Sequence, residues 1–590
     1  LELLGSPFDR VNHTADVRSI AKGCGKHNIP NIGLFLWRLQ SYSVMRGTAR
    51  AVSQPADGRY TFDPLGLDMP LFNRPQTETD ITHLAEEINV PSSLRRRPLY
   101  DELEARRQAL VEDRPPRSIY FGTESVFEVF INGQRDPIPP DQIVICDLTA
   151  PSEPIPTGWR RPPASKTYTR SNGTTVDLPI QVAVDPVLGR IAFPTGVTPA
   201  EVNVSYAYGF SGDLGGGPYD RRHSLAAALN QPVTWQMGVT KDAPTGQTQL
   251  VKTLTEAVPA WNSQPPGTVG IIAIMDSRTY SEDLTGSNAL TIPAGSQLVI
   301  VAADWPEDEV PGSPGQKQRV TGQLTPTGRR PHLQGNLSIR GTAAADSPNP
   351  GELVIDGLLI EGAMTVVVGN LGTLRIAHST LVPGFGGLTV NSSVQQGQQN
   401  ERLIITIERS ISGPLSLTDT VRLLRIEDSI VDGGTGPAIT ASASEVHSST
   451  ILGETRLRSL EAGNSIFTGP VEAERRQTGC VRFSYLPDGS RTPRRYRCQP
   501  DLALKEIKDP IQQASIRARL MASFTSVRYG HPGYAQLTLT CAEEIRTGAE
   551  DGSEMGVFSG LKQRQREANL GLQLEDHLRF GLEAGNFYVT

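Results

Sequence analysis

The chain has 590 residues, a formal net charge of −7 and a hydrophobic content of 37%, with 57 glycines and 45 prolines. At ~100–200 residues per domain, this length predicts several domains. The low apolar content and the many turn residues are unlike a compact α/β enzyme and favour a loop-rich β protein. The acidic balance argues against a nucleic-acid binder. No run of ~18 apolar residues occurs, so we expect no direct membrane span.

The N-terminal residues and the cysteines indicate how the chain is processed and in which cellular compartment it folds. The chain begins at Leu1 with neither the basic start nor the apolar core of a signal peptide, so we expect a truncated or processed N-terminus, with room for an upstream domain. The absence of any Cys-x-x-Cys pair favours reduced, structural cysteines in a protein folded in the cytosol. A Cys480–Cys498 crosslink and a metal site with Cys541 stay open as alternatives. The five cysteines are Cys24, Cys146, Cys480, Cys498 and Cys541.

Residues 1–117 are predicted to form an irregular N-terminal region with one helix. The apolar run at residues 31–39, which contains Trp37, is long enough for one buried strand or two helical turns. Residues 99–114 place leucines on one helical stripe, with acids early and arginines late, which predicts the helix. Because Pro, Asn and Gly are frequent elsewhere, we expect this region to lie across a neighbouring part or subunit.

Residues 118–210 are predicted to form a small antiparallel β domain. Apolar residues alternate before the turn Asn132-Gly133, which predicts a hairpin, and residues 185–189 predict a second turn. Residues 202–208 alternate as a strand with one apolar face. Residues 211–266 are predicted to be a linker, because the glycine-rich residues 212–222 offer little to pack. Gly215 to Gly217 lack the ending of a phosphate-binding loop, so a flexible segment is the better interpretation.

Residues 267–477 carry a repeat that predicts a right-handed parallel β-helix. A repeat of about twenty residues, rich in β-branched side chains and broken by glycine, is typical of a solenoid. Gly357 is assigned to the same position of an earlier repeat. Serine at this bend suggests a hydrogen-bonded serine ladder along the stack. The shared serines, separated by 31, 19, 20 and 16 residues, are Ser379, Ser410, Ser429, Ser449 and Ser465.

Residues 478–590 are predicted to form an α+β assembly segment. Its most unusual feature is a cluster of arginines interleaved with Phe483, Tyr485 and Tyr496, a mixture that protein interfaces favour. A solvated loop and nucleic-acid binding are the alternatives. The predicted interface residues are Trp37, Arg482, Arg491, Arg494, Arg495, Tyr496, Arg497, Phe587 and Tyr588.

The repeats carry acidic and histidine side chains of the kinds that catalyse hydrolysis. Many parallel β-helices cleave polysaccharides with convergent carboxylates, but residues 376–470 contain no Trp or Tyr to stack on a sugar. His378 and His447 lie beside serines without an orienting acid, so we interpret them as bend or surface residues. We therefore predict no catalytic residue, no metal site and no cofactor. The acids weighed, and interpreted as solvated, are Asp356, Glu361, Glu408, Glu427, Asp428, Asp432 and Glu445.

Four stretches (residues 13–39, 204–222, 480–501 and 550–590) together resemble a large bacterial protein of contractile-injection-system and phage-tail-like gene clusters. The resemblance implies a structural, oligomeric baseplate or tail-associated component and supplies no catalytic residue. It implies as partners other baseplate, sheath or spike proteins, and further copies of the chain in a symmetric arrangement. It also implies assembly in the bacterial cytoplasm before incorporation into the particle. The alternatives are a tailspike-like polysaccharide-degrading enzyme and a non-catalytic surface-binding adhesin.

Overall fold

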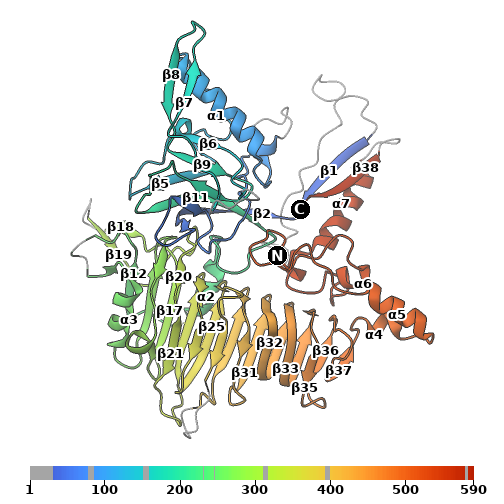
Figure 1. The fold of residues 1–590 in the computed structure, drawn as a ribbon. Helices are drawn as coiled ribbons and strands as arrows, with labels where there is room; N and C mark the ends of the chain where they lie inside the picture. Colours follow the sequence, from blue (N-terminus) through green and yellow to red (C-terminus); the bar gives the residue numbers. More distant parts are fainter. Residues whose placement is uncertain are drawn as a thin grey trace.

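The computed structural model describes residues 31–77, 86–150, 158–229, 231–244, 246, 248–309, 316–391, 399–577 and 583–589. Cys24 and the first part of the stretch 13–39 therefore lie outside the described residues. Strands hold 38% of the residues and helices 14%, which makes the protein mainly β. A parallel sheet of 24 strands fills the lower half of Figure 1, with a β domain above one end and short helices beside the other.

The β domain is built from two sheets, and the region expected to be irregular contributes to both. β2, β3 and β4 come from residues 40–61; β2 and β4 pair with strands of residues 128–210, and β3 pairs with β4. One pair, β6 with β9, is parallel, so the predicted all-antiparallel arrangement is not kept. The strands are β2 (Gln40–Thr48), β3 (Arg50–Ala51), β4 (Arg59–Thr61), β5 (Glu128–Ile131), β6 (Ile143–Ile145), β9 (Val182–Asp185), β10 (Arg190–Ala192) and β11 (Val202–Phe210).

The turns of this domain are only partly as predicted. β9 and β10 form the hairpin expected around residues 185–189. The hairpin expected at Asn132-Gly133 is wrong, since β5 pairs with β11 instead. Pro137, Pro139 and Pro140 follow this turn, and prolines lack the N–H that a returning strand would donate. A separate hairpin, β7 (Ser165–Thr169) with β8 (Thr175–Pro179), projects from the domain.

The predicted helix is confirmed as α1 (Arg96–Val111). Leu99 and Leu103 are fully buried, as their helical spacing requires. Arg107 on the same helix is also fully buried. It donates to the Tyr168 hydroxyl at 2.6 Å and to the Ile143 carbonyl at 2.6 Å, so the helix is bonded to both β7 and β6.

The 24-stranded sheet contains three ladders of parallel pairs, and between β14 and β31 consecutive strands belong to different ladders. Two long strands, β32 (Ile430–His447) and β33 (Thr450–Gly463), run through all three. The first ladder also contains β12 (Trp235–Val239), β14 (Val269–Ile274), β17 (Gln297–Ala302), β22 (Gly351–Asp356), β25 (Leu371–Ala377), β28 (Ile404–Glu408), β31 (Leu423–Glu427), β36 (Cys480–Arg482) and β37 (Arg494–Tyr496).

The other two ladders are shorter. The second contains β15 (Thr279–Ser281), β20 (His332–Gln334), β23 (Leu359–Glu361), β26 (Thr380–Leu381), β29 (Ile411–Ser412) and β34 (Ile466–Phe467). The third contains β16 (Leu290–Ile292), β21 (Leu337–Gly341), β24 (Met364–Val366), β27 (Leu388–Val390), β30 (Leu415–Ser416) and β35 (Val471–Ala473). Alternate Leu, Ile and Val residues of all three ladders form one continuous buried core.

The sheet begins earlier than predicted, and the segment expected to be a flexible linker is packed. β12 already pairs with β14, and β13 (Leu250–Val251) and α3 (Leu254–Asn262) lie beside it. Trp261 of α3 is buried in the same core. Residues 212–222 lie against the sheet rather than in solvent, since Leu214, Tyr219 and Arg221 are all buried.

The serine ladder is confirmed. The backbone N–H of each serine donates to the hydroxyl of the next one, from Ser379 to Ser410 (3.1 Å) through to Ser449 and Ser465 (3.2 Å). A further serine, Ser484, extends the series. Each hydroxyl in turn donates to the carbonyl two residues before it.

A left-handed residue precedes each of these serines, with φ between 44° and 54°. Gly357, with φ 83°, occupies this preceding position rather than the serine position. Its assignment was therefore one residue out of register, and Leu358 is the residue that donates to Ser379 Oγ.

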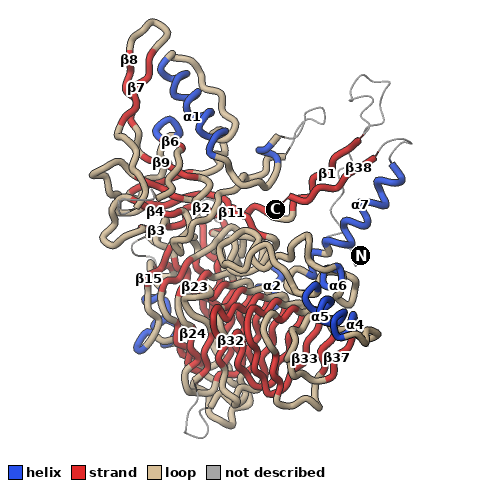
Figure 2. The backbone as a smooth tube through the Cα atoms, turned by 45° about the vertical axis from the view of Figure 1, so that its right-hand side comes forward, coloured by secondary structure: helices blue, strands red, loops and turns tan. Residues whose placement is uncertain are grey.

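The C-terminal segment begins at the last strand of the large sheet and returns to the strand formed by residues 31–37. It contains α4 (Asp501–Leu504), α5 (Pro510–Arg519), α6 (Glu543–Arg546) and α7 (Gln563–His577). Leu570, Leu572 and Leu574, which alternate like a strand, lie in α7. β38 (Glu583–Val589) pairs in parallel with β1 (Asn31–Trp37), and this ribbon projects from the body in Figures 1 and 2. No helix in the described ranges has the length and apolar character needed to cross a bilayer.

Candidate functional site

The five predicted arginines gather at the last strand of the large sheet. Arg494 and Arg495 lie on β37, and Arg482 on β36 is in register with Tyr496, the residue after Arg495. Arg482, Arg491, Arg494 and Arg497 are exposed. Arg495 differs, because it donates to Thr492 Oγ1 (2.8 Å) and the Ser490 carbonyl (2.5 Å) and pairs with Asp501 (3.0 Å). We call the exposed arginines together with Tyr496 the arginine end.

Aromatic rings support part of the arginine end. Phe483 and Tyr496 meet edge to face at 5.6 Å between ring centres. The guanidinium of Arg497 lies 5.7 Å from the Tyr496 ring and 5.9 Å from the Phe483 ring, near the limit of a cation–π contact. Tyr485, by contrast, is buried in a small core with Leu537 and Ile545 and is no part of this surface.

The other predicted interface residues come together on the β1–β38 ribbon. Phe35 stacks on Phe587 with ring centres 5.4 Å apart, and these rings are 63% and 52% exposed. Side chains alternate across a strand, so Trp37 and Val589 lie on the same face as these rings, and Leu36 and Tyr588 on the other. Tyr588 is hydrogen-bonded to Glu567 of α7, and burial raises the pKa of its hydroxyl to about 12.

The exposed face of the ribbon leads into an apolar cavity of about 410 Å³. The cavity lies where residues 37–39, residues 70–95 and residues 525–533 meet. Together with Phe35 and Phe587 it makes a continuous apolar surface, which we call the ribbon face. Its apolar lining residues include Trp37, Leu39, Phe72, Pro91, Pro532 and Val589.

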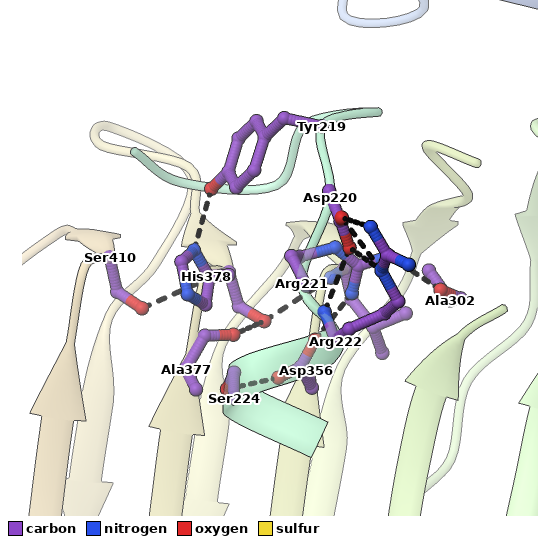
Figure 3. Close-up of polar contacts among 12 residues, drawn as sticks. Tyr219, Asp220, Arg221, Arg222, Ser224, Ala302, Asp356, Ala377, His378 and Ser410 are labelled. Atoms are coloured by element: carbon purple, nitrogen blue, oxygen red, sulfur yellow. Dashed lines mark hydrogen bonds and ion pairs between the residues drawn. The ribbon is translucent and has the colours of Figure 1, made fainter. Parts of the chain in front are cut away.

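The segment 212–222 is bound to the large sheet through a buried polar cluster (Figure 3). Arg221 pairs with Asp356, and both side chains are fully buried. Asp356 also accepts from Ser224 Oγ at 2.6 Å, and Arg221 donates to the Ala302 carbonyl at 2.5 Å. A side chain at Gly357 would meet the Arg221 guanidinium at 1.8 Å, so glycine is required there.

His378 belongs to the same cluster and does not form a Ser–His pair. Its Nδ1 lies 3.0 Å from the Tyr219 hydroxyl, whereas the Ser379 hydroxyl donates to the Ala377 carbonyl. The left-handed φ of 45° confirms the bend, but the side chain is buried rather than on the surface. Burial, with smaller effects from nearby arginines, lowers the pKa of His378 to about 3, so the ring is neutral.

Most of the acids considered as candidate glycan-cleaving groups form ion pairs or hydrogen bonds with other side chains. Glu361 pairs with Arg50 at 2.8 Å and lies 3.2 Å from His332. Asp432 accepts from the Tyr534 hydroxyl at 2.7 Å, beneath the C-terminal segment. Arginines also pair with Asp356, Glu408, Asp428 and Glu445. Glu361 and Asp356 are buried, so the expectation of solvated acids is wrong for these two.

A buried junction between the three parts of the molecule could not be predicted from any motif of the chain. Asp63 of the β domain, Arg330 of the large sheet region and Tyr529 of the C-terminal segment line a cavity of about 40 Å³. Arg330 donates to the Gly216 carbonyl at 2.9 Å and lies 4.7 Å from the Tyr208 ring centre. Burial raises the pKa of Asp63, and the charge of Arg330 partly offsets this.

Metal and cysteine chemistry are not supported by the described part of the chain. Cys146, Cys480, Cys498 and Cys541 are all free thiols there, so the Cys480–Cys498 crosslink is not formed. No group of three or more His, Cys, Asp or Glu side chains among these residues is arranged to hold a metal ion. Cys498 instead donates to the Val481 carbonyl at 3.3 Å, and its side chain is buried in the core of the large sheet.

Comparison with protein families and with curated proteins finds no match for this chain.

Proposed function

We propose that this protein is a structural baseplate component of a contractile injection system or phage-tail-like particle. It holds neighbouring subunits through its terminal segments, and it acts mechanically rather than as an enzyme. Its partners are other baseplate, sheath or spike proteins and further copies of itself, first in the bacterial cytoplasm and then in the particle. The resemblance of residues 13–39, 204–222, 480–501 and 550–590 supports the class of particle.

The exposed ribbon face is the observation that best supports an assembly role. A two-stranded ribbon is marginal in water, and parallel strands are normally covered on both faces. Here α7 lies beside one face, while Phe35 and Phe587 stay more than half exposed on the other. An apolar surface of this kind marks a protein contact. We propose that a neighbouring subunit covers it.

The large sheet supplies the rigid body in this proposal. We propose that its three ladders close into a right-handed parallel β-helix, which projects as a stiff arm or plug. Continuous side-chain stacking and the serine ladder support this arrangement, because each strand can bury its apolar residues only against the next one.

Co-purification with particles tests the proposal. We expect the full chain to be recovered with sheath-containing particles, and Phe35→Asp with Phe587→Asp to reduce this recovery at least about tenfold, because a buried contact cannot accept unpaired charges. The matched control is Val187→Asp with Val197→Asp, at apolar residues of the β domain that are 39% and 45% exposed.

The control pair should leave recovery unchanged. A protein that stays monomeric and absent from particles would contradict the proposal. Degradation of purified capsule polysaccharide by the isolated protein would favour the tailspike-like enzyme instead.

A further inference from the structure

The last strand of the large sheet has an open edge. β37 pairs with β36, and the Tyr496 carbonyl accepts from the Phe483 N–H at 3.0 Å. Successive peptide groups of a strand point to opposite sides, so the N–H and C=O of Arg495 face away from β36. Within the described residues no strand pairs there. An unpaired edge of this kind is a template for another strand.

The two ends of the sheet differ in how closely the neighbouring helices cover them. At the first end, α3 packs against the core and buries Trp261 together with Leu254 and Val258. At the last end, α4 and α5 bury none of their side chains, and Ile511 is 79% exposed. The arginine end is therefore left accessible by the helices that follow it.

Charge alternates along the outer side of the third ladder and then stops. Arg456 lies in register with Glu472, and Glu472 lies in register with Arg491, at 3.8 Å between the charged groups. In the first ladder, Arg425 pairs with Glu445 of the next strand at 2.8 Å. In both places, an arginine is followed by a glutamate one strand further on. Arg491 and Arg494 have no following strand, so the complementary residues would be acidic.

We propose that the arginine end binds an extended acidic segment of a neighbouring subunit, which adds to β37 as a further parallel strand. Its carboxylates pair with Arg494 and, beyond the bend at Pro493, with Arg491, and its main chain bonds to Arg495. This inference rests on the assembly role proposed above and identifies one partner surface for it.

A peptide suits this surface better than a nucleic acid does. The carboxylates of Glu472 and Asp501, which are 57% and 49% exposed, pair with Arg491 and Arg495. These carboxylates would repel a continuous phosphate backbone. An extended peptide can instead place a carboxylate opposite Arg494 and direct its peptide groups at the open edge.

The probe is a fluorescent seven-residue peptide in which glutamate alternates with valine, titrated against the full chain by anisotropy. We expect saturable binding. Arg491→Glu with Arg494→Glu should weaken it at least about tenfold, because each reversal places like charges together. The control is Arg340→Glu with Arg422→Glu, two exposed arginines of the same sheet region that lie far from β37. This control should bind as the unaltered chain does.

A second peptide with the same side chains, N-methylated at alternate residues, tests strand addition. It keeps every charge and removes the N–H groups, so we expect its binding to be lost. Equal binding of the methylated peptide, or tighter binding of a thymidine oligonucleotide, would overturn the inference in favour of a general anion-binding surface. If the peptide fails to bind while the chain still co-purifies with particles, this inference fails alone.

Discussion

His378 is a histidine that folding keeps neutral. Burial, with smaller contributions from Arg409, Arg221 and Arg375, lowers its pKa from 6.5 to about 3. Between these values the unfolded chain binds a proton that the folded chain does not. The stability that neutral His378 contributes is therefore fully present above pH 6.5 and is lost as the pH falls toward 3.

Replacing His378 with a side chain that does not titrate should flatten this dependence. In His378→Gln we expect the unfolding free energy to fall less steeply from pH 7 to pH 4, by up to about 1.4 kcal/mol per pH unit. Urea unfolding at several pH values measures it. His223→Gln, at an exposed histidine directly after residues 212–222, is the matched control and should keep the slope of the unaltered chain. Identical slopes for both variants would contradict the assignment.

At the scale of elements, the serine ladder joins neighbouring turns of the large sheet. The Ser429 hydroxyl accepts from the Ser410 N–H at 3.0 Å and donates to the Glu427 carbonyl at 2.6 Å. Ser429→Ala leaves a buried N–H without a partner, which costs about 1–3 kcal/mol. We expect a lower melting temperature and faster hydrogen exchange at the Ser410 amide.

Ser412 provides the comparison. It is equally buried on the neighbouring strand β29, but its hydroxyl bonds only the adjacent Gly413 carbonyl, at 2.9 Å. Ser412→Ala should therefore be milder than Ser429→Ala and should leave exchange at Ser410 unchanged. If both variants were equally mild, the ladder would contribute little to stability.

Local patterns predicted those elements whose partners are close in sequence. The repeating serines predicted the ladder because each turn sits beside the next, and the stripe of Leu99 and Leu103 predicted α1. The pairing of β1 with β38 could not be predicted. About 550 residues separate the two strands, and the sequence of one strand does not specify which strand it pairs with. Leu570, Leu572 and Leu574 alternate as in a strand but lie in α7, because alternation over five residues does not separate a strand from a helix.

At the scale of the whole molecule, three parts are joined at interior polar contacts. Arg50 links the β domain to Glu361 of the large sheet, and Gln536 of the C-terminal segment donates to Ser211 Oγ at 3.0 Å. The junction of Asp63, Arg330 and Tyr529 lies between all three. The sequence could not reveal it, because glycine-rich residues 212–222 resemble a linker until a partner surface packs against them.

Arg330→Met should loosen this junction. The variant leaves the Asp63 carboxylate buried without its compensating charge, which costs about 3–5 kcal/mol. We expect a lower melting temperature and earlier proteolytic cleavage near residues 212–222. Adding Asp63→Asn removes the uncompensated charge and should restore most of the loss. A single variant that melts as the unaltered chain does would rule out this role for Arg330.

The ten steps of the first ladder, from β12 to β37, also fix a length. Neighbouring strands are about 4.8 Å apart, so the stack holds its two ends roughly 48 Å from each other. The large sheet thus serves as a ruler between the β domain and the arginine end. Deleting or duplicating one repeat would change that spacing by a fixed increment and leave the chemistry of both ends intact.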